Sequence, residues 1–243
     1  MLAQGLVRRK LFPGSDCLKM ADREAGLSAE LLAHRWVVGC FQEVDRTDIH
    51  FATLERGACA YQYEKGYHQK QHGLMIAWRT QPRLITDAQG NKRQGVAFQK
   101  DPVDSKIVYL DDVDAEAFLS DESKQKRRQA RQGLSEAAEK AAKRAGSRQT
   151  RNIALMVALR FADEEDESAP EGGVSRSKGI IVATTHLFWH PMHAYERVRQ
   201  AGIILRELDQ FRKSRGEWKD WEIVLAGGEF ASELRLIEAH HTE

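Results

Sequence analysis

The chain has 243 residues, of which 42% are hydrophobic and 30% charged, and this length and composition predict one soluble α/β domain and exclude a disordered or fibrous chain. The formal net charge of +1 excludes a global electrostatic bias towards nucleic acid or a membrane surface. Any such partner must therefore be met by a local patch.

Cysteine usage and the first residues bear on the compartment. The three cysteines, Cys17, Cys40 and Cys59, are too few for a disulfide framework, which indicates a reducing compartment. The opening stretch has no apolar core long enough for a signal peptide, and no segment approaches the length of a membrane span. The sequence therefore predicts a cytoplasmic or nuclear protein that is not secreted and has no membrane partner.

Short apolar strands alternate with charged helical stretches along the chain. The first helix is predicted over 28–36, with Ser28 as N-cap and apolar residues at helical spacing behind it. Apolar runs predict strands over 37–44, 72–79, 151–161, 180–187 and 221–228. An amphipathic pattern between the last two strands predicts a long helix over 195–213. The run 151–161 is almost continuously apolar, so we expect it to be covered on both faces. This order predicts an α/β sandwich.

Two segments interrupt that order. The stretch 123–148 is helix-prone and strongly basic, with few apolar residues beyond alanine and Leu134, so it cannot be a core helix. It is either a solvated surface helix or a positive platform for a phosphate backbone, and the sequence leaves both open. The stretch 163–178 is acidic, contains Gly, Ser and Pro, and is predicted to be a loop.

Side chains that carry chemistry gather where the predicted strands end. Gln42-Glu43 closes the first strand, and a carboxylate in that place can bind a hard cation such as Mg²⁺. His72 opens the next strand, and His186 follows two threonines on an otherwise apolar strand. Each residue alone is more often structural, because a strand-end Glu is usually a surface residue and a lone His is usually held by hydrogen bonds. Their combination favours a functional site.

Five motifs occur in a fixed order: CFQEVDR, HGLMIAWR, RNIALMVAL, ATTHLFWHP followed by ERVRQAGIILREL, and VLAGG. In this order they resemble the endonuclease/exonuclease/phosphatase superfamily, most closely the branch of Ccr4-type deadenylases, nocturnin, angel proteins and fungal Ngl-type RNA exonucleases. The opening MLAQGLVRRKLFP also looks like that branch's first strand exit. The resemblance covers 1–228 as one partial domain, apart from the two interrupting segments, and leaves 229–243 as a divergent tail.

The resemblance implies a four-layer α/β sandwich of two packed mixed β-sheets flanked by helices, with the active site at one end. It implies that Glu43 holds Mg²⁺, or Mn²⁺ in its place. It also implies that His186 contacts the scissile phosphate and stabilises the charge that develops there. The helix that carries Arg197 and Gln200 is expected to back the strand of His186.

The resemblance further implies a set of substrate contacts. Pro191 matches a proline that lines the pocket for the terminal base of the substrate. Asn152 matches an asparagine at the start of the strand that flanks the cleft, and His72 is assigned to substrate binding with it.

The chain departs from the superfamily's pattern near both ends. The first metal-site asparagine of the family falls directly before Met1. The family motif Gly-Asp-Phe-Asn reads Gly228-Glu229-Phe230-Ala231 here, so Glu229 stands in the place of the general base. The terminal Asp-His pair is missing from the tail. We therefore expect a chain truncated at both ends, with an incomplete fold and no measurable activity as it stands. The abrupt loss of resemblance after Gly228 favours an error in the coding sequence over a degenerate member.

The expected function is a Mg²⁺-dependent phosphodiesterase of the RNA 3′-5′ exonuclease type, a hydrolase whose partner is RNA, as poly(A) or an RNA 3′ end. Two alternatives stay open. One is a catalytically inactive RNA-binding module that uses the basic stretch 123–148, which strong salt dependence of binding without turnover would mark. The other is a phosphatase acting on a small phosphorylated nucleotide.

Overall fold

The computed structural model describes residues 20–34, 36–56, 60–86, 90–111, 121–130, 132–136, 138, 150–162, 179–190 and 193–228. Its elements are, in order, α1 (Met20–Ala33), β1 (Val38–Val44), α2 (Thr47–Arg56), β2 (Tyr61–Gly66), β3 (Gly73–Arg79), β4 (Leu84–Thr86), β5 (Lys92–Gln94), β6 (Asp104–Tyr109), α3 (Asp121–Ala130), β7 (Ile153–Arg160), β8 (Gly179–His186), α5 (Ala194–Lys213), the short 3-10 helix η4 (Gly216–Trp218) and β9 (Glu222–Gly228).

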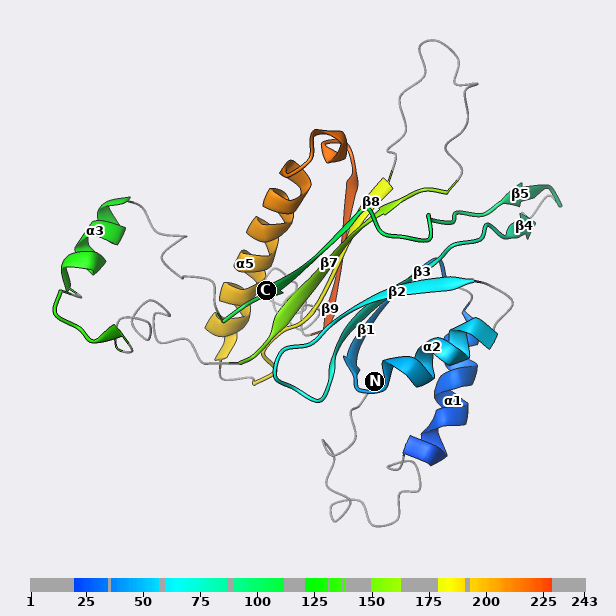
Figure 1. Ribbon diagram of the computed structural model, residues 1–243, viewed down its shortest axis with the longest axis horizontal. Coiled ribbons are helices and arrows are strands. Elements are labelled where there is room, and N and C mark those ends of the chain that lie inside the picture. Colours follow the sequence, from blue (N-terminus) through cyan, green and yellow to red (C-terminus); the bar gives the residue numbers. More distant parts are fainter. Residues whose placement is uncertain are drawn as a thin grey trace, which may run out of the picture.

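Two sheets form the body of the molecule. The first has the order β1-β3-β2 and is antiparallel throughout its described strands. The second has the order β6-β7-β8-β9 and is mixed, because β9 runs parallel to β8 while the other pairs are antiparallel. A parallel neighbour needs a crossover, and α5 with η4 supplies it. Figure 1 shows α1 and α2 on one side of the two sheets and α5 on the opposite side.

Alternation along the central strands divides the core into layers. On β3, the residues Leu74, Ile76 and Trp78 pack in one cluster with the odd-numbered residues of β7 from Ile153 to Leu159. The intervening β3 residues Met75 and Ala77 pack in a different cluster, with residues of α1 and α2. Successive strand residues point to opposite faces, so one side of β3 faces the other sheet and the other side faces the helices.

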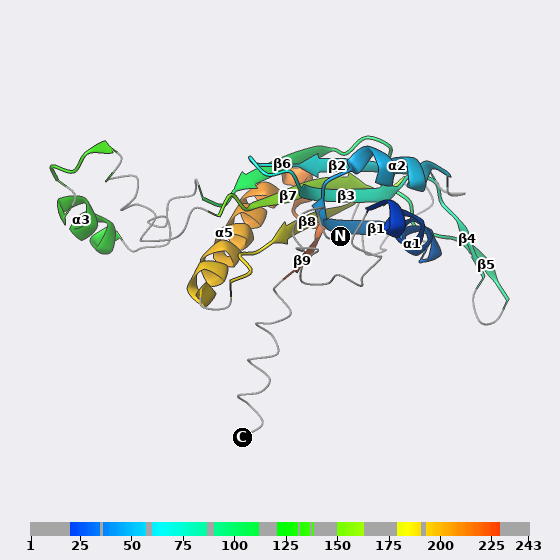
Figure 2. The same ribbon diagram turned by 90° about the horizontal axis from the view of Figure 1, so that it is seen from below.

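The second sheet divides in the same way. The residues Ala154, Met156 and Ala158 of β7 form a cluster with residues of α5 and with Trp218 and Trp221 beyond it. The order of layers is therefore helices, first sheet, second sheet, helix, which Figure 2 shows from below. The predicted four-layer α/β sandwich is confirmed, as is the burial of the strand within 151–161 on both faces, since its first seven residues from Ile153 are all buried.

The predicted start of the first helix is wrong. Helix α1 begins at Met20, so Ser28 lies inside the helix and its hydroxyl contacts the Thr53 hydroxyl of α2 at 3.2 Å instead of capping a helix end. Residues of high helix propensity before Ser28 extend the helix backwards. Trp36 lies beyond the helix end, where its ring contacts Phe41 and Tyr61.

The interrupting segments are described only in part. Helix α3 (Asp121–Ala130) confirms the helical tendency at the start of the basic stretch, and Lys124 and Lys126 form ion pairs with Asp121 and Glu122 of the same helix. The acidic stretch 163–178 and the tail 229–243 lie outside the described residues. Among the helices that are described, none is long and apolar enough to cross a membrane.

Candidate active site

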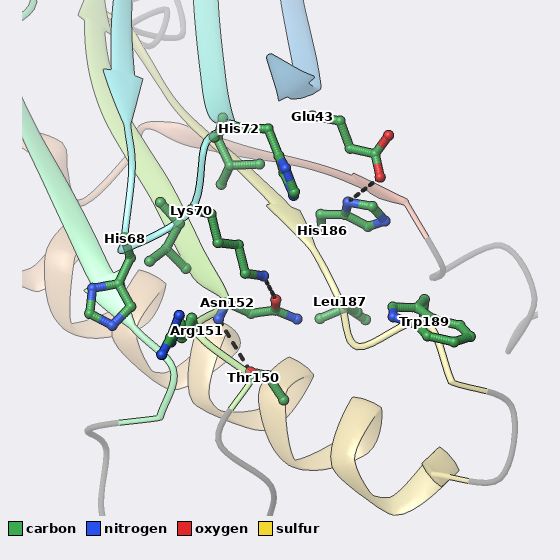
Figure 3. A pocket seen from close by; sticks show the side chains of 13 residues that line it. Glu43, His68, Lys70, His72, Thr150, Arg151, Asn152, His186, Leu187 and Trp189 are labelled. Carbon is green, nitrogen blue, oxygen red and sulfur yellow. Dashed lines mark hydrogen bonds and ion pairs between the residues drawn. The ribbon is translucent and has the colours of Figure 1, made fainter. Parts of the chain in front are cut away.

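A cavity of about 350 Å³ opens where four strand ends meet. Antiparallel pairing sets Val44, at the end of β1, beside Gly73, at the start of β3. The same kind of pairing sets the end of β8 beside the start of β7. The cavity therefore collects side chains from both sheets, as Figure 3 shows. Its lining residues are Glu43, His68, Lys70, His72, Gly73, Leu74, Thr150, Arg151, Asn152, Ile153, His186, Leu187 and Trp189.

Glu43 sits at an irregularity of β1. The register with β3 shifts between Gln42 and Val44, and Glu43 between them has a φ of 55°, in the left-handed region that favours glycine. Such a bulge changes the direction of one side chain, which no longer follows the regular alternation between the two faces of the strand. Here it directs the Glu43 carboxylate into the cavity, with only 17% of the side chain exposed. A strained backbone that presents a carboxylate in a cavity is typical of a functional residue.

His186 faces Glu43 from the other sheet. It is the last residue of β8, and its Nδ1 lies 3.8 Å from Oε1 of Glu43, an ion-pair distance longer than a hydrogen bond. The strand behind it is held firmly, because Thr185 is fully buried and donates its hydroxyl hydrogen to the Ile153 carbonyl at 2.9 Å. The 29% exposure of the His186 side chain leaves part of the ring open to the cavity.

Lys70 brings a cation into the cavity from the loop between β2 and β3. Its Nζ donates to Oδ1 of Asn152 at 2.7 Å. Burial lowers the pKa of Lys70 below its ordinary value, and the nearby Asp111 carboxylate opposes this shift in part. The loop can approach so closely because Gly73 has no side chain: a Cβ there would lie 2.2 Å from the Gly66 carbonyl oxygen.

Arg151 is the second cation that lines the cavity. Its φ is 55°, and its backbone N–H donates to the carboxylate of Asp111, which also accepts from the Thr150 hydroxyl. Sequence reasoning did not single out Lys70 or Arg151. The signal for Lys70 was its place in the polar, histidine-flanked run HQKQH, which ends on the first residue of the second motif. The signal for Arg151 was its place as the basic residue that opens the third motif, RNIALMVAL.

The structure brings together most of the predicted site residues. Glu43, His72, Asn152 and His186 all line the same cavity, although they come from four separate segments. Their roles stay predictions. Pro191 and Glu229 lie outside the described residues.

The helix expected to back the His186 strand does so. Gln200 on α5 is fully buried and accepts from the backbone N–H of Phe188 at 3.0 Å. Arg197 donates to the His190 carbonyl at 2.8 Å. The helix thus holds the turn that follows β8.

The lining residues suit a hard divalent cation that keeps part of its water shell. Within the described part of the chain, no three His, Cys, Asp or Glu side chains cluster closely enough to enclose a metal ion. Glu43 is the one carboxylate among the residues that line the cavity. Mg²⁺ commonly binds through one or two carboxylates, with waters and substrate phosphate completing its octahedron. Glu43 fits that mode of binding and does not fit an all-protein metal cage.

Comparison with known proteins gives relatives in sequence, although no protein-family model matches the chain. The chain is 29% identical over 237 residues to the Schizosaccharomyces pombe protein named "Probable RNA exonuclease C9B6.11c". This match covers 96% of this chain and 35% of that protein. The chain is 30% identical over 215 residues to RNA exonuclease NGL2 of Saccharomyces cerevisiae, covering 86% of this chain and 33% of that protein. The chain thus spans about a third of the length of the curated relatives it matches.

Comparison with solved structures concerns the fold. The human nocturnin catalytic domain superposes with a TM-score of 0.50 at 16% identity, over 93% of this chain and 59% of that domain. The sequence matches bear out the resemblance to the Ngl-type RNA exonucleases, and the superposition shows that the chain shares the fold of the nocturnin catalytic domain.

Proposed function

We propose that this chain is the catalytic region of a metal-dependent phosphodiesterase that resembles the RNA 3′-5′ exonucleases. One observation carries the proposal: the carboxylate of Glu43 faces the imidazole of His186 in a cavity whose other wall holds Lys70 and Arg151. A phosphodiester needs both a metal-binding carboxylate and cationic contacts to its oxygens, and the cavity offers both. The relatives named as RNA exonucleases support RNA as the substrate.

Each residue then has a distinct task. Glu43 holds Mg²⁺ or Mn²⁺, and the bound cation supplies charge stabilisation at the phosphate. His186 donates a hydrogen bond to a phosphate oxygen as negative charge builds up there. Lys70 and Arg151 contact phosphate oxygens that the reaction does not change.

We propose further tasks for the other predicted site residues. Asn152 and His72 bind the substrate near the reacting phosphate, and Pro191 lines the place of the terminal base. Glu229 takes the place of the general base that activates water.

The function is tested on a chain completed with the superfamily's remaining motifs, with a 5′-labelled single-stranded RNA in the presence of Mg²⁺. We expect stepwise shortening from the 3′ end with release of nucleoside 5′-monophosphates, loss of cleavage in excess chelator, and protection of RNA whose 3′ end is blocked. Cleavage that persists in chelator would contradict a metal-dependent reaction. Binding without cleavage, weakened steeply by salt, would indicate an RNA-binding module instead.

The size of the cavity favours a second candidate. A volume of about 350 Å³ suits one nucleotide, so a small phosphorylated nucleotide could also be the substrate of a phosphatase at this site. The products separate the two reactions, because a phosphatase releases inorganic phosphate and leaves the RNA chain length unchanged.

Trp189 is expected to stack on a base of the RNA. It lines the cavity, and 65% of the residue is exposed, so its ring is available to a ligand. Base stacking on an aromatic side chain is worth about 1–3 kcal/mol, so Trp189→Ala should weaken single-stranded RNA binding by about tenfold. Tyr195→Ala is the matched control, because Tyr195 is 64% exposed and lies outside the cavity lining. Equal losses in fluorescence-anisotropy titrations of both variants would contradict a stacking role.

Lys70 is expected to make RNA binding sensitive to alkaline pH. Its charge attracts phosphate below its pKa, and burial sets that pKa below the ordinary lysine value of 10.5. Affinity for oligo(A) should therefore be complete at lower pH and fall as the pH rises through the lowered pKa. Lys70→Arg should abolish the fall, because arginine stays protonated in this range. The measurement is a titration at each pH in constant salt, and an identical alkaline fall in Lys70→Arg would exclude Lys70 as its source.

A further inference from the structure

Gln200 lies at the centre of a buried polar network behind the cavity. It is fully buried, and both atoms of its amide are saturated. Its Oε1 accepts from the Phe188 backbone N–H at 3.0 Å and from Nδ2 of Asn152 at 3.3 Å. Its Nε2 donates to the Thr150 hydroxyl at 3.0 Å and to Oε1 of Glu196 at 3.1 Å. One side chain of α5 therefore contacts the start of β7 and the turn after β8 together.

The orientations of two amides follow from groups that can only donate. A backbone N–H group can donate a hydrogen bond but cannot accept one. The Gln200 atom that faces the Phe188 N–H must therefore be its oxygen. Asn152 must then present its nitrogen to Gln200 and its oxygen to the opposite side. There the ammonium of Lys70, which also can only donate, meets that oxygen at 2.7 Å. The Phe188 N–H at one end of this series of hydrogen bonds and the Lys70 ammonium at the other end require the same orientation of the Asn152 amide.

This orientation matters because Asn152 lines the cavity. One hydrogen of its Nδ2 is used by Gln200, and within the described part of the chain the other has no acceptor. That hydrogen is free to donate to a phosphate oxygen. If Gln200 were absent, the Asn152 amide would lose the acceptor that fixes its nitrogen side.

A rigid frame supports Gln200 in turn. Glu196 and Arg199 form an ion pair at 2.7 Å with both side chains only 4% exposed, and Arg199 also donates to the carbonyl of Leu110, the residue directly after β6. A buried ion pair whose other hydrogen bonds are satisfied resists rearrangement, since breaking one partner leaves a buried charge. Gln200 is thus attached to a part of the helix that cannot easily turn.

We propose that Gln200 is a positioning residue for the substrate: it orients the Asn152 amide toward the bound phosphate and fixes the turn that follows His186. The part of this inference that concerns RNA rests on the proposed function. The part that concerns the Asn152 amide does not, because it depends on protein contacts alone.

The first test measures the amide itself. In ¹H–¹⁵N spectra, the two side-chain amide signals of Asn152 are identified by their loss in Asn152→Ala. The signal of the hydrogen that faces Gln200 should exchange slowly with solvent, and in Gln200→Met it should exchange at least about tenfold faster, because the hydrogen bond that protects it is gone. Unchanged exchange would overturn the inference whether or not the protein binds RNA. Gln210→Met is the control, because Gln210 is an exposed glutamine further along the same helix.

The second test measures coupling in RNA binding, with a non-hydrolysable phosphorothioate oligo(A). Gln200→Met should weaken binding by about tenfold in the parent chain and by less than about twofold in Asn152→Ala, as expected for residues of one hydrogen-bond network. Equal losses in both backgrounds would mean that Gln200 acts through the fold in general, and would overturn the inference. If the parent does not bind RNA, the proposed function fails and the exchange experiment alone decides. If Gln200→Met does not fold, Gln200→Asn replaces it, because its shorter amide cannot reach Asn152 and Phe188 together.

Discussion

Replacing Glu43 by glutamine should lower metal-dependent RNA cleavage by about a thousandfold, because several kcal/mol of charge stabilisation depend on the metal ion that the carboxylate holds. The amide has the same shape but carries no charge, so the fold should be retained. The measurement is single-turnover cleavage in a chain completed with the superfamily's remaining motifs, together with Mn²⁺ binding by electron paramagnetic resonance on the 243-residue chain. Full cleavage by Glu43→Gln, with unchanged Mn²⁺ affinity, would exclude Glu43 as the metal ligand.

A second substitution at the same position separates function from stability. Glu43→Gly removes the carboxylate but also relieves the left-handed conformation at φ 55°, which costs a side-chain-bearing residue about 1 kcal/mol. The melting temperature should therefore stay within about 4 °C of the parent while metal binding is lost. Gln69→Gly is the control, because Gln69 has a φ of 51° on an exposed loop and carries no proposed role. A large loss of stability in Glu43→Gly alone would show that Glu43 is mainly a structural residue.

His186→Ala should lower the rate of phosphodiester cleavage by about 10²–10³-fold, the loss typical of removing one donor to a developing negative charge. RNA affinity should change little, because most of it comes from contacts to backbone charge. The two quantities are measured on the completed chain as the single-turnover rate and the dissociation constant in chelator.

A matched histidine tests whether the effect belongs to the cavity. His34 also pairs with a carboxylate, Glu30 at 2.8 Å, but it lies on the exposed surface directly after the end of α1. His34→Ala should leave both the rate and the affinity unchanged. If affinity falls as far as rate in His186→Ala, then His186 contacts the substrate before the reaction and does not act on the transition state.

The central strands could be predicted from the sequence because they are buried on both faces. The apolar runs that became β3, β7 and β8 predict them to within a few residues at each end. Four of the described strands escaped prediction. β2 and β6 lie at sheet edges and carry mixed polar sequences, YQYEKG and DSKIVY, and the short strands β4 and β5 pair only with each other. Edge strands have fewer buried positions, so their apolar signal is weaker.

The site was predictable only where motif and strand end coincide. Glu43 and His186 each stand at the end of an apolar run, and the structure brings them to opposite sides of one cavity. Lys70 lies in a loop, where no periodicity marks a residue, and its approach depends on close packing around Gly73. The part played by Gln200 also escaped, because a glutamine on an amphipathic helix gives no sign of which buried amide it will meet.

The contact between Glu43 and His186 joins the two sheets, and this links the cavity to a particular part of the core. Glu43 belongs to the first sheet and His186 to the second, so their separation of 3.8 Å also measures how the sheets sit against each other. The side of β7 that carries Leu155 packs against the first sheet, whereas the side that carries Met156 packs against α5. We therefore expect a volume change at Leu155 to disturb the packing between the two sheets and with it the cavity, whereas one at Met156 acts first on the packing against α5. Over evolutionary time, the two faces of a single strand should therefore diverge at different rates, with the inter-sheet face the slower.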